Sequence, residues 1–94
     1  MTTLHIEHPI TDFEIWSTSF HQFADARQAA GVRAHRVQRP VDDPHYVVVD
    51  LEFDDVDAAV AFRHFLTTVV WAIPDNAPAL VGTPKATVLE PASL

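Results

Sequence analysis

The sequence predicts an α+β domain in which four strands form an antiparallel sheet and two helices cover one of its faces. Segments with apolar residues at every second position alternate with segments in which they recur every three or four positions. The resulting order is strand, helix, strand, strand, helix, strand. The length of 94 residues is close to the commonest size of one domain, and 48% of the residues are hydrophobic, which is enough for a core. We therefore expect residues 1–94 to form a single domain.

The first strand is expected over residues 2–8, where Leu4 and Ile6 alternate with the polar residues His5 and Glu7. Alternation over this length is typical of a strand with one buried and one exposed face. We expect Leu4 and Ile6 to face the helices, and His5 and Glu7 to lie on the opposite face of the sheet.

The first helix is expected over residues 12–30. Thr11 and Glu14 have the spacing of a capping box, in which Thr11 is the N-cap and Glu14 reaches back to it. Gly31 is a natural stop just beyond the last turn. One face of this helix is predicted from residues at helical spacing, namely Phe13, Trp16, Phe20, Phe23 and Arg27.

The next two strands are expected over residues 32–39 and 45–53, joined by a turn of proline and aspartate residues at 40–44. A short turn makes them an antiparallel hairpin. If the turn is closed between residues 40 and 45, Arg33 lies opposite Glu52 and His35 lies opposite Asp50. Both pairs join opposite charges and would face away from the helices, which favours this register.

A second helix is expected to begin at Asp54 or Asp55 and to end before Pro74, and a last strand is expected over residues 85–90. The apolar positions of this helix are Ala58, Phe62, Phe65, Leu66, Val69 and Ile73. The complete order of elements corresponds to two split βαβ halves, which is the ferredoxin-like sandwich with both helices on one face of the sheet.

Composition excludes several classes of function. Thirteen acidic residues against six Lys and Arg give a formal charge of −7, which disfavours nucleic acid and anionic membranes as partners. The chain has no cysteine, hence no disulfide, thiolate nucleophile or cysteine-ligated zinc. No apolar run approaches membrane-spanning length and the N-terminus does not have the pattern of a signal peptide, so we expect a cytoplasmic protein.

The helix-free face of the predicted sheet mixes charged and apolar side chains. We expect it to meet a second copy of the chain in a homodimer. A solvated face with cross-strand ion pairs and a ligand or metal site are the alternatives. The residues expected there are Arg33, His35, Arg39, Tyr46, Asp50, Glu52, His5 and Glu7, with Val37, Val48 and Leu89 as an apolar patch.

Residues 12–20 (Asp-Phe-Glu-Ile-Trp-Ser-Thr-Ser-Phe), the exit Arg27-x-x-x-Gly31-Val32 and the order of elements resemble the dimeric α+β barrel superfamily. That superfamily includes antibiotic-biosynthesis monooxygenase-like proteins, stress-responsive barrel proteins and small polyketide cyclases. The resemblance implies that two protomers pack sheet to sheet. It also implies that a pocket lies between helices and sheet or inside the barrel.

Trp71 carries a further part of this resemblance. The haem-degrading and anthrone-oxidising branches have a Trp late in the second helix, and Trp71 is similarly placed. The anthrone-oxidising branch also has an Asn about one turn earlier, where this chain has Thr67. The haem-degrading branch needs a His further along, and no His follows His64 in this chain.

The candidate catalytic residues are His35 and Asp50, because a carboxylate that orients an imidazole raises its basicity. A structural ion pair is the alternative reading. His5, Glu7 and Trp71 are candidate ligand-binding residues, the first two also as a second acid–base pair. Packing under the following loop is the alternative for Trp71. No metal site is expected, since no two His residues are spaced by four on a helix.

The predicted function is that of a homodimeric α+β barrel protein that holds a small apolar or aromatic organic molecule. As an enzyme it would need no cofactor and would work by proton transfer, like a monooxygenase or a cyclase. Catalysis by His35 requires the barrel to enclose it. The alternative function is a non-catalytic ligand-binding or protein-interaction module.

Overall fold

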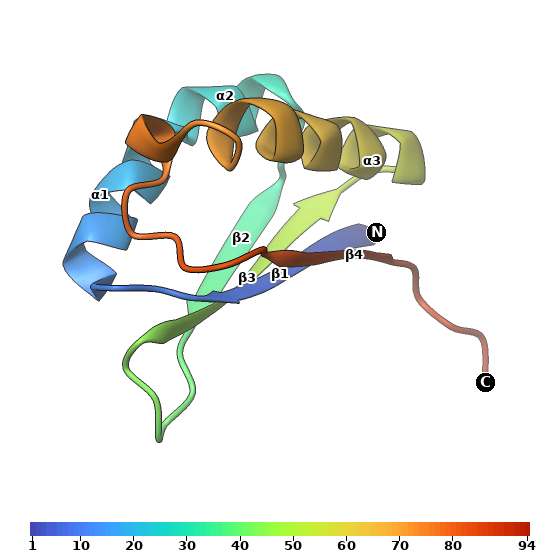
Figure 1. The fold of residues 1–94 in the computed structure, drawn as a ribbon. Coiled ribbons are helices and arrows are strands. Elements are labelled where there is room, and N and C mark those ends of the chain that lie inside the picture. The colour runs from blue at the N-terminus through green and yellow to red at the C-terminus, as the bar shows by residue number, and fades with distance from the viewer.

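Four antiparallel strands form one sheet, and the helices lie together on one of its faces (Figure 1). The computed structural model describes residues 1–94. The strands are β1 (Thr2–Pro9), β2 (Ala34–Gln38), β3 (Tyr46–Phe53) and β4 (Lys85–Leu89). Their order across the sheet is β2-β3-β1-β4, with β1 and β3 at the centre. This arrangement confirms the predicted ferredoxin-like sandwich.

The core lies between the sheet and the helices, because the central strands bury every second residue. Four residues of β1 and four of β3 face the helices and are buried, whereas the residues between them are at least partly exposed. The buried ones are Thr2, Leu4, Ile6, His8, Val47, Val49, Leu51 and Phe53. The alternation predicted for the first strand is therefore confirmed, and it continues to His8.

The first predicted helix is divided into α1 (Phe13–Gln22) and α2 (Ala24–Ala29), because Phe23 leaves the helical conformation at φ −100° and ψ 16°. The prediction of one continuous helix over residues 12–30 was wrong at this residue. The predicted stop is confirmed, since Gly31 ends α2 with a positive φ of 89°.

The N-cap of α1 is Asp12, and the prediction of Thr11 was wrong. The Asp12 carboxylate accepts a hydrogen bond from the amide of Ile15 at 3.0 Å. The amide of Thr11 instead donates to the carbonyl oxygen of Ala79 at 2.9 Å, so Thr11 belongs to the connection from β1. Asp and Thr are both good N-caps, and the chain uses the one that lies a residue later.

The register of the hairpin differs from the prediction by one residue. Arg36 lies opposite Asp50, and His35 lies opposite Leu51. The predicted pairs Arg33–Glu52 and His35–Asp50 were therefore wrong. The connecting loop covers residues 39–45, longer than predicted, and the observed register turns Val37 toward the core and Arg36 toward the helix-free face. Burial of an apolar side chain prevailed over a charge pair available at an exposed edge.

The second helix, α3 (Val56–Phe65), begins after Asp55, whose carboxylate accepts from the amide of Ala58 at 2.8 Å. It continues as a wider π-helical turn, η1 (Leu66–Val70), which is followed by the short 3-10 helix η2 (Pro74–Asn76). None of these helices is long and apolar enough to cross a membrane.

The wide turn changes which side chains of this segment are buried. Val69 and Ile73, predicted to be on the apolar face, are 36% and 45% exposed, whereas Val70 is buried. The prediction assumed a regular α-helix up to Pro74. One extra residue in the turn rotates everything after Leu66 relative to that assumption.

Candidate functional site

An apolar pocket lies between the helices and the sheet. Thirteen of its 17 lining residues are hydrophobic. Its empty volume is about 640 Å³ when the open mouth is included. The centre of a water molecule can occupy about 80 Å³ of it. The sheet contributes Ile6, Val49 and Leu51 as the floor, and the opposite wall includes Phe62, Leu66 and Val70. The lining of the pocket, mostly apolar with a few polar groups, is typical of sites that hold small organic molecules.

Aromatic rings from α1 form one side of the pocket. Trp16 and Phe20 both line it, and their rings stack at a centroid distance of 4.9 Å and an angle of 23°. Phe13 extends the stack, at 5.7 Å from Trp16. Residues four apart on a helix lie one above the other, so this part of the sequence builds a continuous aromatic surface. Such a surface suits a flat aromatic ligand.

Trp71 lines the same pocket as the aromatic rings of α1. Its amide donates to the carbonyl oxygen of Leu66, five residues earlier, at 2.7 Å, which is the hydrogen bond of a π-turn. In an uninterrupted α-helix, Trp71 would point away from Phe62. The wide turn instead brings it to the side of Phe62 and Leu66.

His8 is the one basic imidazole of the pocket, and it is 4% exposed. Its Nδ1–H donates to the carbonyl oxygen of Pro9 at 2.8 Å, so Nε2 carries the lone pair. Nε2 has no hydrogen-bond partner in the protein. Every side-chain nitrogen or oxygen that is fully buried does have a partner, so Nε2 is not fully buried. Nε2 is therefore accessible, and His8 is one of the residues that line the pocket. Burial lowers the pKa of His8 below its usual value, so the ring is neutral at pH 7.

Arg27 brings a cation into the pocket wall, although it is only 8% exposed. Its NH1 donates to the carbonyl oxygen of Phe20 at 2.6 Å, and the guanidinium carbon lies 3.7 Å from the centroid of the Phe20 ring. Burial lowers the pKa of Arg27, but a guanidinium stays charged in proteins. None of the ion pairs of the structure includes Arg27.

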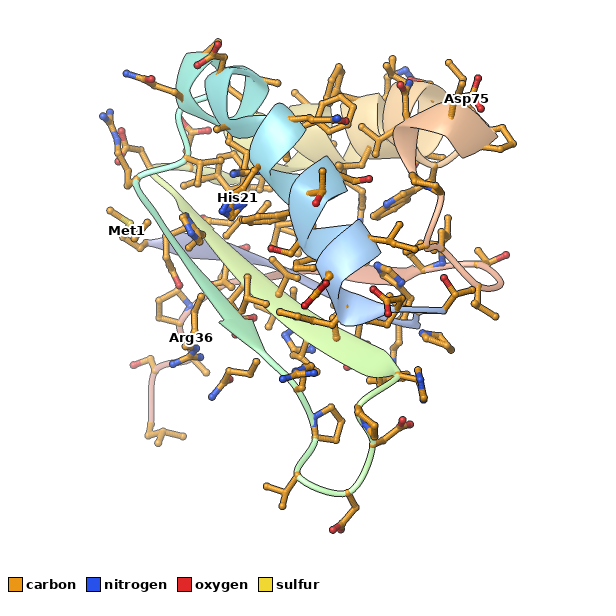
Figure 2. The ribbon with its side chains drawn as sticks, turned by 90° about the vertical axis from the view of Figure 1, so that its left-hand side faces the viewer. Met1, His21, Arg36 and Asp75 are labelled. Carbon is orange, nitrogen blue, oxygen red and sulfur yellow. The ribbon has the colours of Figure 1, made fainter.

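A second group of polar side chains lies on the helix-free face and is called the polar chain below. It runs through Arg36, Asp50, His5, Glu7 and Tyr46. Arg36 binds Asp50 at 3.0 Å, and the other oxygen of Asp50 lies 2.6 Å from Nδ1 of His5. Nε2 of His5 lies 2.9 Å from Glu7, which also accepts from the Tyr46 hydroxyl at 2.8 Å. Figure 2 shows Arg36 projecting from β2 away from α1.

His5 is held between two carboxylates, so both of its ring nitrogens donate only when the ring is protonated. The hydrogen bonds to Asp50 and then to Glu7 raise the pKa of His5. The hydrogen bond from His5 lowers the pKa of Glu7. Burial acts to raise the pKa of Asp50, but the hydrogen bonds from His5 and Arg36 outweigh it and hold that pKa below its usual value.

The predicted site residues do not come together at one place. His5, Glu7 and Asp50 join in the polar chain, and Trp71 lines the pocket on the other side of the sheet. The predicted pair of His35 with Asp50 was wrong. His35 is exposed at the sheet edge, with its ring 5.4 Å from that of Phe20 on the helix side. No group of three or more His, Asp or Glu is placed to hold a metal ion.

His8 and Arg27 are two polar pocket residues that the sequence analysis did not predict as such. The signal for His8 was present, because it continues the alternation of Leu4 and Ile6 on the buried face of β1. Arg27 stands at helical spacing after Phe20 and Phe23, which also placed it on the face that meets the sheet. In both cases the available signal was a polar side chain at a position that the pattern predicts to be buried.

Comparison with known proteins shows the fold. No protein-family model and no curated protein sequence matches the chain. Several solved structures are similar over almost its entire length. The cofactor-independent oxygenase SnoaB from Streptomyces nogalater is 18% identical with a TM-score of 0.72, and the alignment covers 99% of this chain and 94% of that protein.

Two other structures extend the comparison. An antibiotic biosynthesis monooxygenase is 14% identical with a TM-score of 0.67, covering 99% of this chain and 100% of that one. A dimeric ferredoxin-like protein from an uncultured marine organism is 10% identical with a TM-score of 0.61, covering 100% and 97%. At these identities the likeness establishes the ferredoxin-like fold of this chain, and it leaves function to be argued from the pocket.

Proposed function

We propose that this chain is a homodimeric α+β barrel protein that binds a small aromatic molecule in the pocket and acts on it as a cofactor-free monooxygenase- or cyclase-like enzyme. The observation that carries the proposal is the pocket itself. It combines aromatic rings from Trp16, Phe20 and Trp71 with a single neutral imidazole, His8, whose free nitrogen is accessible. The shared fold with a cofactor-independent oxygenase supports the same reading.

The chemistry available to His8 is proton transfer. Nε2 would accept a proton from an acidic C–H or O–H of the ligand and leave its bonding electrons on the ligand as an enolate or phenolate. In a monooxygenase-like reaction, this carbanion reduces molecular oxygen, and the balance is one methylene plus one O₂ giving one carbonyl and one water. In a cyclase-like reaction, the carbanion attacks a carbonyl carbon of the same molecule, and the resulting alkoxide takes the proton back.

The helix-free face of the sheet supports the proposed homodimer. The polar chain has two cations and two carboxylates, so its formal charges cancel when His5 is protonated. Val48 lies beside it, half-buried in the single chain, and Leu89 is 44% exposed on the same face. A neutral face with apolar side chains can pack on its own copy, and one protein of this fold is described as dimeric.

A non-catalytic binding module is the second candidate, and one observation favours it. The Nδ1 of His8 is held by a carbonyl oxygen and not by a carboxylate, so nothing raises its basicity against the effect of burial. In this case the pocket would hold the same kind of ligand without converting it.

A tricyclic anthrone distinguishes the two candidates, since it has an acidic methylene and a flat aromatic body. Binding is measured by quenching of Trp16 and Trp71 fluorescence, and turnover by oxygen uptake. His8→Gln should keep binding within a few-fold and lower turnover about 10²- to 10⁴-fold. His21→Gln, which changes an exposed histidine of α1 outside the pocket (Figure 2), should leave both unchanged.

Binding without turnover in the wild type would identify the binding module for this ligand class. Equal turnover in wild type and His8→Gln would exclude His8 as the base. Absence of binding by any flat aromatic compound would contradict both candidates.

A further inference from the structure

Arg27 is a buried cation for which the protein supplies no anion. Removing a charge from water is costly unless it is paired, and buried charges in proteins normally are. The pocket lining contains no Asp or Glu, although the chain has 13 acidic residues. An oxygen anion on a ligand in the pocket would supply the missing counter-charge.

The guanidinium also has unused hydrogen-bond donors. NH1 donates to Phe20, but Nε and NH2 have no partner within the protein. Since no buried side-chain nitrogen is sealed off without a partner, these donors are reached from outside. The contact with Phe20 holds the guanidinium in place, so its remaining donors are oriented before a ligand arrives. Oriented donors of this kind suit a bidentate oxygen anion.

The backbones of Arg27 and His8 lie beside different parts of the sheet that forms the floor of the pocket. The backbone carbonyl oxygen of Arg27 accepts a hydrogen bond from the amide of Val32. The next amide, that of Arg33, donates to the carbonyl oxygen of Glu52 near the end of β3. His8 lies opposite Val47, near the start of β3. Val47 and Leu51 are separated by roughly 13 Å along an extended strand. The backbone of Arg27 therefore lies toward one end of the pocket and that of His8 toward the other, and the guanidinium of Arg27 reaches back over Phe20.

We propose that the ligand of this pocket is an aromatic acid, a flat apolar molecule with one ionised oxygen group that pairs with Arg27 while its other end reaches His8. This inference rests on the proposed function and specifies its ligand class. A carboxylate, or a phenolate or enolate, provides the required oxygen anion. The aromatic rings of Trp16, Phe20 and Trp71 contact the body of the molecule between the two ends.

Two fluorescent probes test the inference directly. 8-Anilinonaphthalene-1-sulfonate and N-phenyl-1-naphthylamine share the same aromatic body, and only the first has an anionic group. We expect the wild type to bind the sulfonate at least about ten-fold more tightly than the neutral probe, as for a hydrogen-bonded charge pair. Arg27→Met should remove this preference and leave the affinity for the neutral probe within about two-fold.

Arg39→Met is the matched control. Arg39 also lies over an aromatic ring, with its guanidinium carbon 4.2 Å from the centroid of Phe13, but it is exposed and does not line the pocket. The preference for the sulfonate should persist in this variant and in Arg27→Lys, which keeps the charge. Circular dichroism checks that each variant is folded.

If Arg27→Met does not fold, the wild type still decides the question. The Nε–H resonance of Arg27 should shift in nitrogen-15 NMR spectra on addition of the sulfonate and stay in place with the neutral probe. Equal affinity of the wild type for both probes, or a preference that survives in Arg27→Met, would overturn the inference while leaving the proposed function intact. Binding of neither probe would contradict the proposed function and this inference with it.

Discussion

His5 shows how one residue can help to link three adjacent strands of the sheet, β1, β3 and the edge strand β2. Its two ring nitrogens contact Asp50 of β3 and Glu7 of its own strand, and Asp50 continues to Arg36 of β2. The side chains of His5 and Asp50 are 27% and 13% exposed, so these contacts are only partly screened by water. The protonated form of His5 is the one that satisfies both neighbours, and it ties the stability of the sheet to pH.

The contribution of His5 to the free energy of unfolding should decrease as the pH rises. Because its pKa is raised in the folded state by Asp50 and Glu7, the contribution is fully present below the unfolded value of about 6.5 and is lost as pH rises through the folded pKa. Urea denaturation should therefore show His5→Gln to be less stable than the wild type by about 1 kcal/mol near pH 6. The difference should shrink toward pH 9.

The exposed variant His21→Gln is the control for this series and should follow the wild type at every pH. A difference between wild type and His5→Gln that grows with pH would show that His5 is not held as the cation. The charge of Lys85 also lowers the pKa of Glu7, so Lys85 is kept in all variants.

At the scale of elements, the wide turn η1 determines what the second half of the pocket looks like. The hydroxyls of Thr67 and Thr68 donate to the carbonyl oxygens of Arg63 and His64 four residues earlier. Trp71 follows one wide turn after Leu66 and lines the pocket. The extra residue in this turn, and not helix propensity, sets the direction of the indole.

Deleting Thr68 should convert η1 into an ordinary α-helical turn. Trp71 would then follow Leu66 by four residues, the spacing of an α-helical hydrogen bond, and would stay on the pocket side. We expect a folded protein with nearly unchanged tryptophan fluorescence and probe binding. Deleting Thr18, an exposed residue of the regular helix α1, should instead turn Phe13 and Trp16 away from Phe20 and strongly reduce stability. Equal damage from both deletions would contradict the role given to η1.

The first turn of α1 provides a second test at this scale. Asp12→Ala removes the carboxylate that caps the Ile15 amide and should cost about 1 kcal/mol of unfolding free energy. Thr11→Ala should cost much less, because its side chain makes no capping hydrogen bond. Thermal or urea denaturation of the two variants measures the difference, and the reverse ranking would restore Thr11 as the cap.

Most of the element order could be predicted from the sequence, because alternation and helical spacing are local patterns. The strands, the stop at Gly31 and the cap at Asp55 followed from such patterns. The hairpin register could not, since it depends on loop length and on which side of an exposed edge strand gains more from burial. The same limit applies to the site. Trp71 could be singled out as a residue, but its direction depends on a π-turn that leaves no clear pattern.

At the scale of the whole molecule, the sheet separates two environments. The pocket and the core lie on the helix side, and the polar chain lies on the other side with Val48. The helix-free face is left uncovered by the rest of the chain (Figure 1). The proposed homodimer would cover it, which gives a small domain a second source of burial.

Light scattering should therefore report a dimer at concentrations of about tens of micromolar. Val48→Lys, which places a charge beside the polar chain on the helix-free face, should shift the protein toward the monomer at the same concentration. Val41→Lys is the control, because Val41 is fully exposed in the loop between β2 and β3. A monomeric wild type, or a dimer equally tolerant of both changes, would show that this face is not the interface.

The alternation of β1 has a consequence for how such a protein can diversify. Ile6 and His8 line the pocket, while His5 and Glu7 belong to the polar chain on the opposite face. Neighbouring positions of one short strand are thus under different selective constraints. A lineage can alter the residues that line the pocket without disturbing those expected to hold two copies together. This separation offers a physical route by which one scaffold can acquire new ligands while its assembly is inherited unchanged.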